Sequence, residues 1–227
     1  MALTTRDIQV VNFLEETRLI MTAEQIARYF YRSQKEQSPR SIKVIASNRL
    51  KMMIKGRYVK RVREFNNQNY IYYNFPKAPK RSEHKLLMSE FLVTMKENHF
   101  NIIKVELEYK GLQKDYGLRP DMRIEFEYYD IKFVAFVEVD HTKTFSNEEK
   151  YKKLIKARKT DPKVAESLTD KFMLISVCDK KPDMKGVQWI KSDMSNFTKF
   201  KYDFDRMLEG CVLQNSTKIK RSIPNLE

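Results

Sequence analysis

Three carboxylates in the middle of the chain have the types and spacing for metal-assisted chemistry. Asp121 follows Pro120 at the start of a predicted strand, and Glu138 and Asp140 stand two residues apart at the end of another. Because side chains alternate along a strand, Glu138 and Asp140 project from the same face, where like charges repel and lose hydration unless a cation or a proton lies between them. Mg²⁺ or Mn²⁺ bound by Asp121, Glu138 and Asp140 would remove this cost and could activate water for phosphodiester cleavage. The alternative is a strand that ends in solvent, with Asp140 as a turn residue.

The elements that must position these carboxylates form an α/β pattern. Residues 133–137 are apolar at every position, which is typical of a central strand covered on both faces. The predicted elements are a helix over 83–98, strands near 101–109, 120–129 and 132–140, a helix near 147–158, and strands over 171–179 and 187–190. The first helix carries His84, Met88, Phe91 and Met95 along one stripe, and the second opens with a capping box, Ser146 and Glu149. This order predicts a sheet between helices.

Positive charge is concentrated at the N-terminal end. The 227 residues include 44 Lys and Arg against 30 Asp and Glu, a formal net charge of +14. Residues 1–82 hold 17 of the basic and 6 of the acidic side chains. A polyphosphate partner explains such a cationic module, because each neutralised phosphate releases a condensed counterion. A solvated patch or a patch that binds a membrane surface is the alternative.

The order of elements in this cationic module is typical of a winged helix. The sequence predicts a helix over 5–16, a short helix over 22–30 that opens with the capping box Thr22 and Gln25, and a helix from Ser38-Pro39 to Gly56. Two β-prone segments, 57–65 and 69–75, then flank Asn66-Asn67-Gln68 and predict a hairpin that would form the wing.

The third of these helices pairs an apolar face with a polar one. Its apolar stripe consists of Ile42, Ile45, Ala46, Leu50 and Met53. Its polar face carries Arg40, Lys43, Ser47 and Lys51, flanked by Asn48 and Arg49. Such a helix suits the major groove, and Lys60, Arg61 and Arg63 of the hairpin would lie along the phosphate backbone. We therefore predict binding of double-stranded DNA; the alternative is a small helical domain whose charges only keep it soluble.

Composition sets the domain boundaries and excludes several classes of protein. The Pro- and Lys-rich segment 76–82 predicts a linker between a winged-helix domain (1–75) and an α/β domain (83–213), followed by a flexible tail (214–227). No apolar run approaches the ~20 residues of a membrane span, and no signal peptide is evident. Cys178 and Cys211 form no CxxC pair, and neither GxxxxGK[ST] nor GxGxxG occurs. We expect a cytoplasmic protein with no membrane partner.

The acidic residues carry a resemblance to known proteins. Pro120-Asp121, sixteen further residues and Glu138-Val139-Asp140 resemble the motif of the PD-(D/E)xK nuclease superfamily, although Asp140 stands where that motif has lysine. Residues 5–178 as a whole resemble the replication-relaxation family of plasmid and mobile-element proteins. That family joins a winged helix to a nuclease-like domain with an E-x-D pattern followed by Thr or Ser, here VEVDHTKT. HKLLMSE, with His84 and Glu90, and EEKYKKLIKA match its helices.

The resemblance implies both a fold and a set of roles. The fold is a winged helix-turn-helix followed by a restriction-endonuclease-like α/β domain. Asp121 and Glu138 would bind Mg²⁺ or Mn²⁺, Asp140 would be a third carboxylate, and Glu90 an outer ligand or water-orienting base. Lys152 or Lys156 would replace the missing lysine, with Lys143 a weaker candidate. The alternatives are an exposed polar Glu90, a solvated lysine face and a packing role for His84.

Three functions follow from these observations. The first is a DNA-binding protein of a plasmid or mobile element that acts in replication, relaxation or transfer with other replication or transfer proteins. The second is an active Mg²⁺- or Mn²⁺-dependent endonuclease or nickase that uses Asp121, Glu138 and Asp140. The third is a winged-helix transcription repressor. If the protein is a homodimer, its DNA site should be a two-fold repeat.

Overall fold

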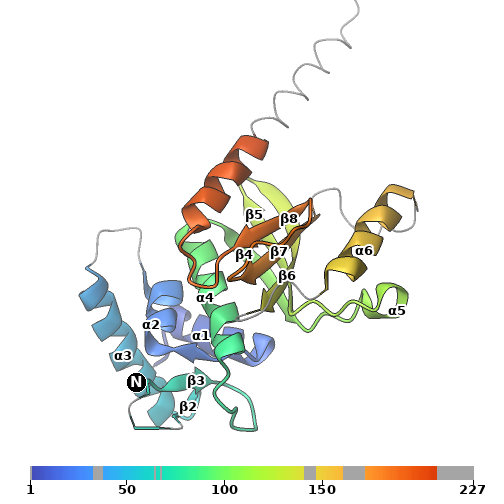
Figure 1. The fold of residues 1–227 in the computed structure, drawn as a ribbon. Coiled ribbons are helices and arrows are strands. Elements are labelled where there is room, and N and C mark those ends of the chain that lie inside the picture. The colour runs from blue at the N-terminus through green and yellow to red at the C-terminus, as the bar shows by residue number, and fades with distance from the viewer. Residues whose placement is uncertain are drawn as a thin grey trace, which may run out of the picture.

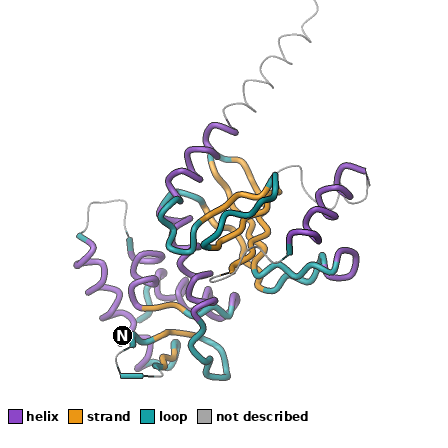
Figure 2. Tube along the Cα trace, viewed as in Figure 1, coloured by secondary structure: helices purple, strands orange, loops and turns teal. Residues whose placement is uncertain are grey.

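The computed structural model describes residues 2–32, 38–63, 65–66, 68–140, 147–160 and 172–208. In these ranges the chain is mixed α/β, with an antiparallel three-stranded sheet followed by a mixed five-stranded sheet (Figure 1). Figure 2 shows helices (purple) next to the strands (orange) of each sheet. The expectation of a mixed helix and sheet architecture is confirmed.

The N-terminal part combines capped helices with the small sheet. Its elements are α1 (Thr5–Thr17), β1 (Met21–Thr22), α2 (Ala23–Ile26), the π-helical turn η1 (Ala27–Tyr31), α3 (Pro39–Lys55), β2 (Lys60–Val62) and β3 (Ile71–Tyr73). Thr22 and Gln25 form the expected capping box, since each side chain accepts from the backbone N–H of the other. Ser38 caps α3, and Gly56 ends it. The polar caps therefore mark the helix ends as the sequence predicts.

Three details of this part differ from the sequence predictions. The predicted helix over 22–30 divides into α2 and η1, which is wound with the wider π-helical turn. β1 was not predicted; it pairs with β3 and gives the order β1-β3-β2. A strand of two residues has no alternation to detect, so only its pairing reveals it. Ile45 was predicted in the apolar stripe but is 39% exposed, because it lies at the margin of the buried face.

The second part is built on the five-stranded sheet. Its elements are α4 (Glu83–Glu97), β4 (Asn101–Leu107), α5 (Gln113–Tyr116), β5 (Met122–Tyr128), β6 (Ile131–Asp140), α6 (Glu148–Thr160), β7 (Phe172–Cys178), β8 (Val187–Ile190) and a helix over 197–208. The strand order is β4-β5-β6-β7-β8. β4, β5 and β6 are antiparallel, whereas β7 and β8 continue parallel to β6. β6 is the central strand, as its continuous apolar run predicts.

Helices cover both faces of this sheet. On one face, Phe126 and Phe133 pack against Phe204 of the helix over 197–208, which also lies near α4 (Figure 1). On the other face, Phe136 belongs to an apolar cluster with Tyr151 of α6. The helix over 197–208 was not predicted, although its phenylalanines at positions 197, 200 and 204 have helical spacing. The predicted arrangement of a sheet between helices is confirmed.

Helix α4 contacts both sheets. It touches β1 on one side and β4 and β6 on the other. The hydroxyl of Ser89, which is fully buried, donates to the carbonyl oxygen of Ile20 at 2.8 Å. The predicted apolar stripe is too narrow: residues 86–89 and 91–95 are all buried, whereas His84 remains partly exposed. An amphipathic pattern fails here because two layers, rather than one layer and solvent, surround the helix.

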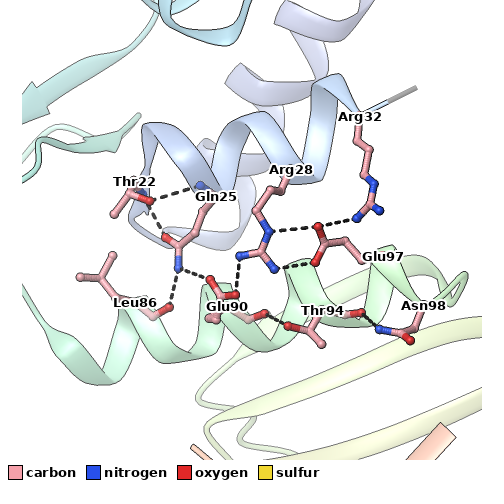
Figure 3. A network of polar contacts seen from close by, with 9 residues as sticks. All are labelled: Thr22, Gln25, Arg28, Arg32, Leu86, Glu90, Thr94, Glu97 and Asn98. Carbon is pink, nitrogen blue, oxygen red and sulfur yellow. Dashed lines mark hydrogen bonds and ion pairs between the residues drawn. The ribbon is translucent and has the colours of Figure 1, made fainter. Parts of the chain in front are cut away.

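A network of polar contacts joins α4 to the N-terminal part (Figure 3). The Arg28 guanidinium donates to Glu97 through Nε at 3.0 Å and Nη2 at 2.5 Å, and to Glu90 through Nη1 at 2.5 Å. Arg32 donates to the same Glu97 carboxylate at 2.6 Å. Burial alone would raise the pKa of Glu97, but the two arginines outweigh it and lower that pKa. Arg28 of η1 and Arg32, the residue that follows η1, thus neutralise the charges of Glu90 and Glu97 on α4.

Gln25 adds a neutral contact to this network. Its Nε2 donates to the Leu86 carbonyl oxygen at 3.0 Å and to Glu90 Oε2 at 3.1 Å (Figure 3). One apolar cluster includes Val10 of α1, Phe91 of α4 and Phe204. Residues 76–82, where the sequence predicts a linker, contain no helix or strand. The division into two domains at this segment stays a prediction, while the core continues from one part to the other.

The Arg28 contacts should contribute measurably to stability. Arg28→Ala would leave Glu90 and Glu97 partly buried without their main partner, so we expect the free energy of unfolding to fall by about 1–3 kcal/mol. Urea denaturation followed by circular dichroism measures this change. Arg6→Ala, at an exposed position of α1, is the control and should change stability by less than about 0.5 kcal/mol. Equal effects of the two substitutions would contradict a structural role for Arg28.

Candidate functional site

The outward face of α3 is cationic and polar at the predicted positions. Arg40, Lys43, Asn48 and Lys51 are exposed and Ser47 is partly exposed. The opposite face buries Ile42, Ala46, Leu50 and Met53. Lys43 Nζ lies 3.8 Å from Glu24 on α2, and in the described ranges no carboxylate forms an ion pair with Arg40 or Lys51. Arg40 and Lys51 are therefore accessible to a polyanion.

The hairpin of β2 and β3 adds a second basic surface. Lys60, Arg61 and Arg63 are exposed, as predicted. The guanidinium carbons of Arg61 and Arg63 lie 4.2 and 4.8 Å from the ring centroid of Tyr70, so both planar groups are held beside one aromatic ring. Lys60 Nζ donates to the Phe75 carbonyl oxygen at 3.2 Å. Asn67 of the predicted turn lies outside the described residues.

A buried ion pair fixes the position of α3. Asp7 on α1 is fully buried and accepts from the Tyr31 hydroxyl at 2.7 Å and from Arg49 Nε at 3.1 Å. Burial would raise the pKa of Asp7, but the bonds from Arg49, Tyr31 and Thr4 together hold it well below the usual value. Arg49 was predicted beside the DNA-facing residues; its guanidinium instead binds Asp7, because the helix turns that position toward α1.

The predicted carboxylates of the second part meet at one end of β5 and β6. The register pairs Met122 with Val137, which brings Asp121 next to Glu138. Asp121 Oδ2 accepts from the Val139 backbone N–H at 2.8 Å. Asp121 Oδ1 lies 3.2 Å from Nε2 of His84, at the start of α4. This hydrogen bond, stronger in its effect than the partial burial of the imidazole, raises the pKa of His84.

Glu138 is the most deeply placed of these acids. Its side chain is buried, and Oε1 accepts from the Tyr151 hydroxyl at 2.8 Å and from Asn147 Nδ2 at 3.1 Å. Burial and the nearby charge of Asp121 raise the pKa of Glu138 to about 8, although these two hydrogen bonds act in the opposite direction. Asp140, at the end of β6, raises it further through its charge. The three predicted carboxylates therefore interact.

Two predicted groups are not brought to the carboxylates. Glu90 was predicted as an outer ligand or base, but its carboxylate binds Arg28 and Gln25 on the side of α4 that faces the N-terminal part. Lys152 was predicted to replace the missing lysine, but its ammonium pairs with Glu148 and Glu149. Lys156 is exposed on the same helix. α6 directs Tyr151 toward Glu138, because its buried face consists of the apolar and aromatic positions.

Sequence reasoning missed the neutral partners of Glu138. Asn147 and Tyr151 are four residues apart, which places them on one side of the start of α6. The helical spacing of Tyr151 and Leu154, which places both on one face of a helix rich in charge, was the signal that could have indicated this contact. Lys143, Ser146 and the HTKT stretch lie outside the described residues, so the predictions made for them stay predictions.

The donor set suits a hard divalent cation. Asp121 and Glu138 supply carboxylate oxygens, which Mg²⁺ and Mn²⁺ prefer, and the hydrogen bonds to Glu138 come from neutral groups. Asp121 and Glu138 could hold such an ion, with Asp140 close enough to act on Glu138 through its charge. Among the described residues, no group of three or more His, Cys, Asp or Glu side chains has the geometry of a complete metal site.

A cavity opens on the Asp121 side of this cluster. It has a volume of about 300 Å³ and lies between the end of α1, the start of α4 and the strands β4 and β5. Arg18, His84, Lys85 and Asp121 are among the residues that line it. Asp121 is therefore accessible from the junction of the N-terminal part with the larger sheet, whereas Glu138 lies buried behind it.

Comparison of the chain with protein-family models, with curated proteins and with solved structures finds no match. The helices in the described parts of the chain include none long and apolar enough to cross a membrane.

Titration of Glu138 should lower the stability of the protein as the pH rises. The folded state, with a Glu138 pKa of about 8, binds a proton more tightly than the unfolded chain, whose glutamates titrate near ~4.3. This stabilisation is complete below the unfolded pKa and is lost as the pH rises through the folded one. We expect the free energy of unfolding of the wild-type protein to fall by an amount on the order of 2–4 kcal/mol between about pH 5 and about pH 9, because Glu138 ionises in this range. Glu138→Gln should not show this fall.

Urea denaturation in EDTA at a series of pH values measures this effect. Glu149→Gln is the matched control, because the Glu149 side chain on α6 is 82% exposed. The control should keep the pH dependence of the wild-type protein. A wild-type slope in the Glu138→Gln variant would show that another group titrates.

Proposed function

We propose that the protein binds double-stranded DNA through a winged helix formed by its N-terminal part, as a component of a plasmid or other mobile element. The observation that carries this proposal is the outward face of α3, where Arg40, Asn48 and Lys51 are exposed opposite the buried stripe. A helix with this division can enter the major groove while its apolar side stays in the core.

The hairpin supports the same proposal. In a winged helix, the β-hairpin after the third helix lies along the phosphate backbone, and here it carries Lys60, Arg61 and Arg63 on exposed positions. The small sheet β1-β3-β2 and the helices α1, α2 and α3 occur in the order that this fold requires. Replication, relaxation or transfer is the process that we infer from the family resemblance, with other replication or transfer proteins as partners.

Substitutions on α3 test the DNA contact. Each of Arg40→Ala, Lys43→Ala and Lys51→Ala removes one cation from the surface proposed to contact phosphate. We expect each to weaken DNA binding roughly 3- to 10-fold near ~0.15 M salt and to lower the slope of log K against log salt by about 0.9. Fluorescence anisotropy with labelled duplex DNA over a range of salt concentrations measures both quantities.

Lys185→Ala is the matched control for this series, because Lys185 is an exposed lysine outside the N-terminal part. It should leave affinity and slope unchanged. If all four variants behave alike, the contact surface lies elsewhere on the protein.

A second function, metal-dependent cleavage of DNA, is favoured by the juxtaposition of Asp121, Glu138 and Asp140. In the structure His84 fixes one oxygen of Asp121, while Tyr151 and Asn147 fix Glu138, so the two carboxylates are held in defined orientations. A bound Mg²⁺ or Mn²⁺ ion would supply an activated water and neutralise charge on the phosphate. The protein would then act as an endonuclease or nickase at the site chosen by the winged helix.

Cleavage is tested on supercoiled plasmid from the native element with Mg²⁺ or Mn²⁺. If the second function holds, the wild-type protein nicks the plasmid, and Asp121→Asn and Glu138→Gln abolish nicking without loss of DNA binding. Glu149→Gln should cleave like the wild type. Binding without nicking by the wild-type protein would leave the DNA-binding function, including the repressor alternative, and exclude cleavage under these conditions.

A further inference from the structure

The centre of the proposed DNA-facing surface is an apolar residue. Val44 on α3 is 54% exposed. At about 100° per residue along an α-helix, Val44 lies about 180° from the buried Met53 and within about 40° of Arg40, Asn48 and Lys51. Val44 is therefore at the midline of the outward face, with charged or polar side chains one or two turns away on both sides.

Neither helix formation nor packing explains a valine at this position. Its branched Cβ makes valine a weaker helix former than the Lys, Arg or Glu residues usual on a solvated helix face. Single exposed apolar residues are common on protein surfaces, so exposure alone indicates nothing. The position is informative because it would lie closest to the bases if α3 enters the major groove.

We propose that Val44 reads the 5-methyl group of a thymine in the DNA site, an inference that rests on the proposed DNA binding by α3. The thymine methyl is the apolar group that the major groove presents, and aliphatic side chains contact it. Asn48, one turn further along the same face, carries the paired donor and acceptor that match adenine. The middle of the recognised sequence should therefore contain A·T pairs.

Other exposed apolar residues do not share this placement. Ile45, the neighbour of Val44, lies about 100° around the helix, toward the side on which Arg49 binds Asp7 of α1. Ile8 is 46% exposed and belongs to α1. Ile8 is therefore a control that matches Val44 in exposure and chemistry but not in position.

The experiment begins with selection of the preferred site from random duplex DNA by the full-length protein. Each thymine of the selected site is then replaced by deoxyuridine, which removes only the methyl group. We expect one or two replacements to weaken wild-type binding about 3- to 5-fold, as for loss of one buried methyl group. Val44→Ala, which removes two methyl groups and keeps only Cβ, should discriminate less between the thymine and uracil forms of those positions, and Ile8→Ala should discriminate like the wild type.

The outcomes separate this inference from the function on which it rests. Salt-dependent DNA binding without any uracil-sensitive position, or undiminished discrimination by Val44→Ala, would overturn the reading of thymine and leave DNA binding intact. Failure of the wild-type protein to bind any duplex would overturn both. A change of oligomeric state in Val44→Ala at unchanged discrimination would assign the valine to a protein contact instead. Circular dichroism of both variants confirms that these surface substitutions leave the fold intact.

Discussion

Helix α4 packs against both sheets, and the contacts of Arg28 with Glu90 and Glu97 neutralise the charges that this packing removes from solvent. A helix buried along most of its length has little solvated surface for its charges, so those charges need partners from the protein. The partners come from η1 and from Gln25, next to the small sheet. If these acids lost Arg28, Glu97 would keep only Arg32 and Glu90 only the neutral Gln25, so negative charge on this surface of α4 would be poorly compensated.

The same helix links the two surfaces to which we assign functions. Its first turn presents His84 to Asp121, and its later turns hold Arg28 through Glu90 and Glu97. The residues of a helix move together, because backbone hydrogen bonds fix each turn to the next. A displacement of α4 at the carboxylate site would therefore also move Glu90 and Glu97, which bind Arg28 of η1. Because η1 also packs against α3, a continuous set of contacts joins the carboxylate cluster to the helix for which we propose DNA binding.

Local patterns in the sequence predicted local structure well. Caps such as Thr22 and Ser38 gave the helix starts, and the apolar run in β6 indicated a central strand. The sequence placed Asp121 at the start of one strand and Glu138 at the end of a neighbouring strand, and the register of β5 and β6 brings the two together. The role of Glu90 could not be predicted in this way, because its partner Arg28 is 62 residues distant and reaches it only through tertiary packing. His84 was ambiguous for the same reason: its contact with Asp121 depends on how α4 crosses the end of the sheet.

The buried Glu138 lowers the stability of the folded protein once it is ionised, and no packing requirement explains a carboxyl group at this position. A buried acid with a pKa near 8 destabilises the protein at alkaline pH relative to an isosteric amide, and Asp121 and Asp140 add to this cost. A glutamine at this position could accept the same two hydrogen bonds, from Tyr151 and Asn147, through its Oε1. Acids with strongly shifted pKa values occur often at functional sites. Asp121, Glu138 and Asp140 gather negative charge at this end of the sheet, and the imidazole of His84 is hydrogen-bonded to Asp121. A bound divalent cation would balance the charge that remains.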